Sequence, residues 1–148
     1  MLHWSLKHFD ELTPHELYAI LRLRSEVFVV EQNCVFLEMD NKDQPCHHLM
    51  GWQQEELVAY TRLVPPGVSY DGFSSIGRVV TAASVRSSGA GKLLMEKSIQ
   101  ELEKSYNQNP IRIGAQLYLE RFYTYFGFVR TSDVYDEDGI DHIEMTRP

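Results

Sequence analysis

A short glycine-rich segment, residues 86–91 (Arg-Ser-Ser-Gly-Ala-Gly), constrains the fold more than any other feature of the chain. The Ile- and Val-rich run 74–81 before it favours a buried strand, and Gly77 within that run indicates a bulge or a close backbone approach. Residues 92–106 after it carry apolar side chains on one helix face, namely Met95, Ile99, Leu102 and Tyr106. The order strand, glycine turn, helix predicts a mixed α/β domain.

The rest of the chain supplies further strands and helices around this unit. We expect helices from Pro14 onward and at 116–126, an acidic loop at 31–46, and strands at 2–8, 47–52, 57–64, 111–115, 129–135 and 142–147. Residues 107–110 stop the helix 92–106, Gly127 caps the helix 116–126, and residues 136–139 form the last turn. Together these elements predict a single three-layer domain spanning residues 1–148.

The first helix has clear start signals. Thr13 is a cap residue, Pro14 suits the first helical position, and Glu16 lies three residues after the cap. The apolar stripe of this helix is Leu17, Leu21 and Phe28, with Ile20 and Val27 beside it. Arg24 falls inside the stripe, so its side chain either extends out of the core, faces a cleft, or pairs with a nearby carboxylate.

Composition and charge argue against several classes of function. A net charge of −7 disfavours a nucleic-acid partner, because binding a phosphate backbone needs many Lys and Arg contacts. No run approaches the roughly 20 apolar residues that cross a bilayer, and the first residues lack the apolar core of a signal peptide, so we expect a cytoplasmic protein without a membrane partner. Cys34 and Cys46 are too few for a disulfide scaffold. Cys46, His47 and His48 lack the second half of a metal motif, so no metal is expected.

The glycine-rich segment suits an anionic ligand. Gly89 and Gly91 allow the backbone to approach a ligand closely. The N–H groups and the dipole of the following helix start attract negative charge, as a pyrophosphate carries. Arg86 and Lys92 add positive charge at the rim.

Two familiar glycine motifs do not fit this segment. A phosphate-binding P-loop needs Ser or Thr after Gly-Lys, where this chain has Leu93. A dinucleotide-binding fold needs a third glycine where this chain has Leu94. An ordinary glycine-containing helix entry remains the alternative.

Two motifs in this order resemble the signatures of the GNAT acetyltransferase superfamily. Residues 86–91, after a Val-rich strand, are similar to the Arg-x-x-Gly-x-Gly signature for coenzyme A. Residues 122–128, Phe-Tyr-Thr-Tyr-Phe-Gly-Phe, are similar to the family's second signature, Phe-Tyr-x-x-x-Gly-Phe. Residues 23–32, 115–116 and 135–143 further resemble the ElaA branch of that superfamily.

The resemblance implies a GNAT-type three-layer sandwich, with a central mixed, mostly antiparallel sheet and flanking helices, that transfers an acetyl group from acetyl-CoA to a primary amine. It implies that the backbone at Val79 and Val80 binds the pantetheine arm and polarises the thioester, and that Tyr123 protonates the departing thiolate. The cofactor-binding segment that it implies is Arg86, Ser87, Ser88, Gly89, Ala90, Gly91 and Lys92. Gln116 stands near where many members have Asn, which affects one hydrogen bond on the CoA side.

The acceptor side carries less specific signals. An attacking amine must lose a proton, and the candidate bases are a water relay, Glu31, Glu38, Asp40, His47, His48, Glu120 and His142. We select His142, at the start of the last strand, because histidine titrates in the useful range; the alternative is an ordinary half-buried strand histidine. Arg24 and Glu31 are assigned to the acceptor side, where the acidic loop favours a cationic acceptor, either a small molecule or a peptide amine. A homodimer is left open.

Two other functions are compatible with the same pattern. The first helix is similar to the start of acyl-homoserine-lactone synthases, although those enzymes are longer and lack a clear Arg-x-x-Gly-x-Gly loop. A GNAT-like domain that binds CoA without catalysis is the other alternative. Replacement of Tyr123 separates catalysis from binding alone.

Overall fold

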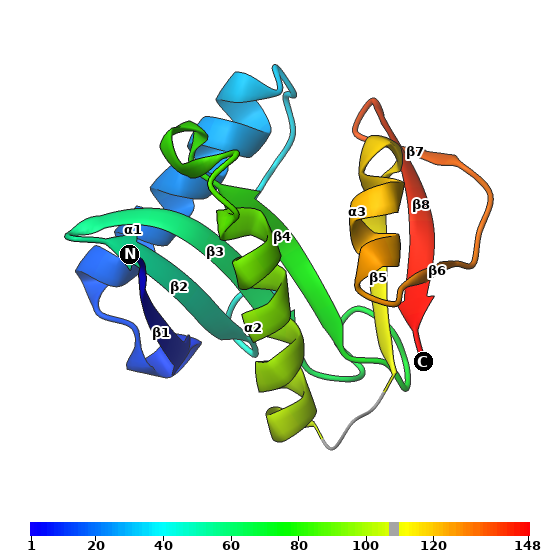
Figure 1. The fold of residues 1–148 in the computed structure, drawn as a ribbon, viewed down its shortest axis with the longest axis horizontal. Helices are drawn as coiled ribbons and strands as arrows, with labels where there is room; N and C mark the ends of the chain where they lie inside the picture. The colour runs from blue at the N-terminus through cyan, green and yellow to red at the C-terminus, as the bar shows by residue number, and fades with distance from the viewer. Residues whose placement is uncertain (107–109) are drawn as a thin grey trace.

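The computed structural model describes residues 1–106 and 110–148, so most of the predicted helix stop at 107–110 lies outside the described residues. The N-terminal part of the chain forms a four-stranded antiparallel sheet in the order β1-β2-β3-β4 (Figure 1). Its strands are β1 (His3–His8), β2 (His47–Gln53), β3 (Glu56–Val64) and β4 (Ser75–Thr81). All four match predicted strands to within a residue or two.

A second sheet is built around the C-terminal strand, β8. Its strands are β5 (Ile111–Gln116), β6 (Val129–Arg130), β7 (Tyr135–Glu137) and β8 (Ile140–Arg147), in the order β5-β8-β6 with β7 also paired to β8. The predicted single strand 129–135 is therefore wrong. Arg130 pairs with Met145 and Tyr135 pairs with His142, so residues 131–134 face only two residues of β8 and leave the ladder.

The two sheets meet at one point and then separate. Ser74 forms an isolated parallel bridge with Ile111, and the N–H of Arg112 donates to the Ser74 carbonyl at 2.9 Å. Figure 1 shows β4 and β5 close at this junction and apart at their other ends. The two strands therefore open into a wedge between the sheets.

Helices cover both faces of the first sheet. Side chains alternate along β3, so Tyr60 packs with Ile20 of α1 (Pro14–Arg24), whereas Ala59 packs with Leu94 of α2 (Ala90–Ser105). The smaller helix α3 (Glu120–Tyr125) lies beside β5 of the second sheet (Figure 1). The predicted three-layer α/β architecture, with a mostly antiparallel sheet and flanking helices, is confirmed. Within the described residues, no helix combines the length and the apolar character needed to cross a membrane.

The cap of α1 is as predicted, but its buried face is not. The Thr13 hydroxyl accepts from the Glu16 N–H at 3.1 Å, and the Glu16 carboxylate accepts from the Thr13 N–H at 2.8 Å. The fully buried residues of the helix and of the π-helical segment Ser25–Glu31 that follows are Ile20, Leu23, Arg24 and Val27. The predicted stripe residues Leu17, Leu21 and Phe28 are only half-buried. Both sets repeat at helical spacing, and only the position of the sheet decides between them.

The boundaries of two other helices also differ from the prediction. Helix α2 begins at Ala90, two residues before the expected start, because Gly89 caps it with a φ of 88°. The predicted helix 116–126 is shorter than expected. Gln116 still belongs to β5, where it pairs with His142 of β8, and residues 117–119 form a 3-10 turn before α3. Gly127 ends this helix with a φ of 92°, as predicted.

Candidate functional site

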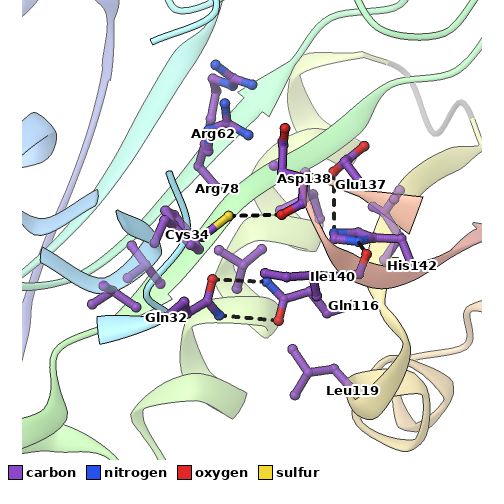
Figure 2. Close-up of a pocket in the computed structure, with 18 of the residues that line it drawn as sticks. Gln32, Cys34, Arg62, Arg78, Gln116, Leu119, Glu137, Asp138, Ile140 and His142 are labelled. Carbon is purple, nitrogen blue, oxygen red and sulfur yellow. Dashed lines mark hydrogen bonds and ion pairs between the residues drawn. The ribbon is translucent and has the colours of Figure 1, made fainter. Parts of the chain in front are cut away.

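A cavity of about 730 Å³ fills the wedge between β4 and β5. Its walls are β4 from Ser75 to Thr81, the inner side of β5, and the start of α2. The loop after α1 and the β7–β8 hairpin close it on the other side (Figure 2). The same opening therefore receives residues from both halves of the chain.

The start of α2 presents unpaired backbone donors. The first hydrogen bond into the helix runs from the Leu93 N–H to the Gly89 carbonyl at 3.2 Å. Among the described residues, the N–H groups of Ala90, Gly91 and Lys92 have no backbone acceptor. Gly89, just before the helix, has a left-handed φ of 88°, an angle that glycine adopts without strain. These donors and the helix dipole suit a pyrophosphate.

The side chains of the glycine-rich segment mostly contact the protein itself. Arg86 donates to the Thr81 carbonyl at 2.9 Å and to Glu31 at 2.5 Å. Lys92 lies 4.6 Å above the Tyr125 ring, and the Ser88 hydroxyl donates to the Val85 carbonyl. Of the seven predicted cofactor residues between 86 and 92, only Arg86 and Gly91 line the cavity. Most side chains of this segment are therefore held by contacts within the protein.

A β-bulge lies on the cavity wall in β4. Tyr60 pairs with Val80 and Arg62 pairs with Gly77, so Thr61 alone faces the two residues between them. One of these two, Arg78, has a φ of 50°. The predicted irregularity near Gly77 is thus real, but the unusual backbone angle is one residue later. Val79 and Val80 both line the cavity, where β5 has moved away from β4.

Tyr123 of α3 also lines the cavity. Its side chain is only 5% exposed and packs edge-on against Phe122 and Phe128 at ring distances of 5.2 and 6.0 Å. Burial, with a smaller contribution from Tyr118, raises the pKa of the Tyr123 phenol. The hydroxyl is therefore protonated at neutral pH and able to donate a proton. Tyr125, two residues later, is 65% exposed and does not line the cavity.

His142 lies across the cavity from β4, at the start of β8 (Figure 2). Its Nδ1 is 2.8 Å from the Ile140 carbonyl oxygen, and its Nε2 is 3.3 Å from a carboxylate oxygen of Glu137. A carbonyl and a carboxylate both only accept, so Nδ1 carries a proton and the contact with Glu137 is favourable when Nε2 carries one as well. The ring also stacks against Tyr135 at 6.0 Å. This geometry binds Nδ1 to the main chain and leaves Nε2 facing the carboxylate of Glu137.

Arg24 does not line the cavity, contrary to its predicted place on the acceptor side. Its side chain is 0% exposed. Its guanidinium instead contacts Glu38 at 3.0 Å and Asp43 at 2.9 Å, which is the ion-pair alternative. Glu31 does line the cavity, but its carboxylate is paired with Arg86. The acceptor and cofactor residues assigned from sequence therefore touch one another.

The chain matches known proteins over almost its whole length. The acetyltransferase (GNAT) domain family matches residues 14–147. The chain belongs to the GNAT acetyltransferase family. It is 40% identical over 149 residues to protein ElaA of Escherichia coli K12, covering 99% of this chain and 97% of ElaA. An acyl-CoA N-acyltransferase from Pseudomonas aeruginosa has a TM-score of 0.95 at 45% identity, and the E. coli ElaA crystal structure has 0.93 at 39%, with 100% of each chain covered. These likenesses place this GNAT protein in the ElaA-like branch.

Most of the other candidate bases of this GNAT domain are occupied. His48 is fully buried between the Tyr60 hydroxyl at 2.6 Å and the Asp43 carbonyl at 2.9 Å, and burial lowers its pKa to about 4. His47 contacts the Tyr106 hydroxyl at 3.3 Å. Three carboxylates lie beside arginines: Glu38 and Asp40 near Arg78, and Glu120 near Arg130. Of the two histidines in β2 and the one in β8, only His142 lines the cavity.

The acidic loop is part of a buried ion network, not an open acidic surface. Its carboxylates Glu38, Asp40 and Asp43 are paired with Arg24, Arg62 and Arg78. Each of these three carboxylates is at least partly buried. The loop therefore no longer argues for a cationic acceptor. The sequence did contain a signal for Arg78, because this arginine directly follows a glycine in an otherwise apolar strand. We did not predict a role for Arg78 from it.

Two contacts across the mouth of the GNAT cleft had no signal in the sequence. The side-chain amides of Gln32 and Gln116 bond reciprocally at 3.3 and 3.4 Å. The Cys34 thiol donates to the Asp138 carbonyl at 3.1 Å. Both contacts link the loop after α1 to the second sheet (Figure 2), across more than eighty residues of sequence. Gln116, in place of the more common Asn, is thus held by another glutamine.

The cysteine and histidine pair near β2 has structural contacts. The Cys46 thiol donates to the Lys42 carbonyl at 3.0 Å, and burial raises the pKa of this thiol to about 12. A thiol of such high pKa is a poor metal ligand and nucleophile at neutral pH. Across the described residues, three or more metal-binding side chains do not gather in any one place.

Proposed function

We propose that this GNAT protein is an acetyl-CoA-dependent N-acetyltransferase that acetylates a primary amine by direct attack in a ternary complex. The observation that carries the proposal is the single cavity that joins the start of α2, the β4 bulge, Tyr123 and His142. These are the parts that hold a phosphate, polarise a thioester, protonate a thiolate and deprotonate an amine. The family membership supports acyl transfer from a CoA thioester.

The start of α2 is the proposed phosphate site. The free N–H groups of Ala90, Gly91 and Lys92 donate to the pyrophosphate, and the helix dipole adds attraction. A Cβ at Gly91 would come within 3.9 Å of Phe122, so a larger side chain there would narrow the space between α2 and α3. The pantetheine arm then follows β4 toward Val79 and Val80. This direction places the thioester at the bulge.

The chemistry proposed for the bulge and Tyr123 is acid-assisted transfer. A backbone N–H at Val79 and Val80 donates to the thioester oxygen, which becomes negative as the amine nitrogen bonds to the carbonyl carbon. The carbon–sulfur bond then breaks, and Tyr123 gives its proton to the thiolate. Tyr123 carries that proton at neutral pH; because burial raises its pKa and makes it a weaker acid, the transfer depends on the new thiolate lying beside the hydroxyl.

His142 is the proposed base. Its Nε2 accepts the proton that the amine loses, while Nδ1 stays bonded to the Ile140 carbonyl. Glu137, 3.3 Å from Nε2 and 53% exposed, links the ring to solvent. The acceptor amine then enters between the loop after α1 and the β7–β8 hairpin. A small molecule or a peptide amine fits this description.

Thermal stability with acetyl-CoA tests the donor. A ligand at about 100 times its Kd adds roughly 2.7 kcal/mol to the free energy of unfolding. Acetyl-CoA should raise the unfolding temperature, and adenosine alone should not. No shift with acetyl-CoA, or an equal shift with octanoyl-CoA and faster turnover of that donor, would contradict an acetyl-specific enzyme. Release of free thiol with a panel of amines then separates an enzyme from a CoA-binding module.

A further inference from the structure

The bulge in β4 has a backbone angle that its own residue does not favour. Arg78 adopts a φ of 50° inside a strand, whereas its neighbour Gly77 does not use the left-handed region. A side chain at such an angle is unfavourable unless the surroundings hold it there. Arg78 therefore needs an external contact to keep this shape.

The contact comes from the loop after α1. Nε of Arg78 lies 2.5 Å from a Glu38 carboxylate oxygen, and its Nη2 donates to the Glu38 main-chain carbonyl at 2.7 Å. The same nitrogen lies 3.3 Å from Asp40. Phe36 covers the guanidinium, with its ring centre 5.8 Å from Cζ. Residues 36–40 thus hold the Arg78 side chain on several sides.

Glu38 is in turn held from inside the core. Nε of Arg24 contacts both Glu38 carboxylate oxygens at 3.0 Å. Arg24 is 0% exposed and Glu38 is 6% exposed, so neither can move without breaking buried charge pairs. The contacts Arg24–Glu38–Arg78 therefore run from α1 to the bulge.

From these contacts we infer that Glu38 is a positioning residue for the site that polarises the thioester, a role that rests on the acetyl transfer proposed above. Glu38 touches neither donor nor acceptor. It binds Arg78 and thereby holds the shape of the bulge, whose backbone N–H is the proposed donor to the thioester oxygen. A preorganised donor is effective because it does not reorient when charge develops.

The carbonyl stretch of bound acetyl-CoA reports this directly. In protein saturated with acetyl-CoA that carries ¹³C at the thioester carbonyl, the isotope-shifted infrared band should lie at lower frequency than in free solution. Glu38→Gln should lose about half or more of that shift, because a displaced donor no longer polarises the bond. Its affinity for acetyl-CoA, measured by calorimetry, should change little.

Arg78→Gln is the second variant, and it is the safer one for folding because Arg78 is 22% exposed. It should lose the same part of the band shift. The double variant Glu38→Gln/Arg78→Gln should lose no more than either single variant, since Glu38 acts through Arg78. A further loss in the double variant would overturn the inference.

Asp43→Asn is the matched control. Asp43 is also buried and also pairs with Arg24, but its other partner is Arg62, not Arg78. This variant should be less stable, yet keep the full band shift. An equal loss in Asp43→Asn, or an unchanged band in Glu38→Gln, overturns the positioning role. Failure of the wild-type protein to bind acetyl-CoA would instead overturn the proposed function itself.

Discussion

Arg86, the first residue of the glycine-rich segment, is bound to Glu31 at the end of the helix-like segment after α1. The guanidinium Nη1 lies 2.5 Å from the Glu31 carboxylate, and the two side chains are 38% and 44% exposed. A positive charge next to the proposed phosphate site is thus partly neutralised before any ligand arrives. The pair sits on the cavity wall, so a ligand must either share Arg86 or compete with Glu31.

Replacing Glu31 should therefore strengthen the binding of CoA. In Glu31→Gln, Arg86 is free to meet the phosphates and a repelling charge is gone. Exposed pairs are worth about 0.2–1 kcal/mol, so we expect up to about a fivefold lower Kd by calorimetry. The gain should shrink at high salt. Weaker binding in this variant would show that Glu31 itself contacts the ligand.

Gly89 should be required for the helix entry and for ligand binding together. A Cβ at Gly89 meets no atom within 4 Å, so Gly89→Ala fits sterically but is strained by the φ of 88°. We expect a loss of about 1 kcal/mol in the free energy of unfolding and a smaller thermal shift with acetyl-CoA. Gly67→Ala is the control, because Gly67 has a φ of 92° and equally open space but lies in the loop between β3 and β4, not at the start of α2. Equal effects on the ligand-induced shift in both variants would argue against the phosphate site.

Sequence patterns correctly predicted those structural features that depend only on neighbouring residues along the chain. The cap at Thr13, the buried face of α2 and the left-handed Gly127 were each readable from a few adjacent residues. The face that α1 buries was not, because Ile20 and Leu21 stand on equally apolar stripes and only the sheet selects one. The predicted strand 129–135 was wrong for the same reason. Residues 131–134 leave the ladder because Arg130 and Tyr135 pair with β8 residues that are too close together to face all of them, and no local pattern shows this.

The candidate site, too, could be predicted from the sequence only in part. The glycine turn and Tyr123 lie in contiguous motifs, and the structure brings both to one cavity. The partners of Arg24 and Arg78 lie 14 and 40 residues away along the chain. No local pattern reveals such pairs. A loop that looked like an acidic surface was therefore a set of counter-ions.

Tyr123→Phe should separate transfer from binding. Loss of the general acid lowers kcat by about 10²-fold or more, while acetyl-CoA affinity should hardly change. Turnover is measured as thiol release with the best acceptor of an amine panel. Tyr125→Phe serves as the control, because Tyr125 is exposed and outside the cavity. Full turnover in Tyr123→Phe would remove this residue from the mechanism.

His142→Gln should slow transfer at neutral pH without weakening acetyl-CoA binding. Gln keeps a polar group near the Ile140 carbonyl but takes no proton from the amine, so kcat should fall by about 10²-fold. Asp141→Asn changes the charge of the adjacent residue, whose side chain is exposed, and should keep normal turnover. If both variants are equally impaired, the effect is one of local charge and His142 is not the base.

Acid should destabilise the ion network around Arg24. Burial acts to raise the pKa of Asp43, but hydrogen bonds and charges from Arg24 and Arg62 outweigh it and lower that pKa; the pKa of Asp40 is lowered against its own burial by Arg62 and Arg78. The unfolded chain then takes up protons first, so this stability is complete above about pH 4 and is lost as pH falls further. Urea unfolding between pH 7 and pH 2 measures the decline.

Asp43→Asn tests the source of this acid sensitivity. Removing one partner of a buried pair should cost about 3–5 kcal/mol at pH 7, because Arg24 and Arg62 lose a shared counter-charge. The remaining stability should then fall less steeply with acid. An unchanged slope would place the acid-sensitive group elsewhere.

The pairing of the second sheet also determines when the site can come into existence. Strands β5, β6 and β7 all pair with β8, and all three precede it in sequence. During synthesis the first sheet has every strand it needs before β5 emerges, whereas the second has no pairing partner until Ile140–Arg147 has been made. A nascent chain can therefore contain every strand of the first sheet and the glycine turn at the start of α2 before the opposite wall of the cavity can form.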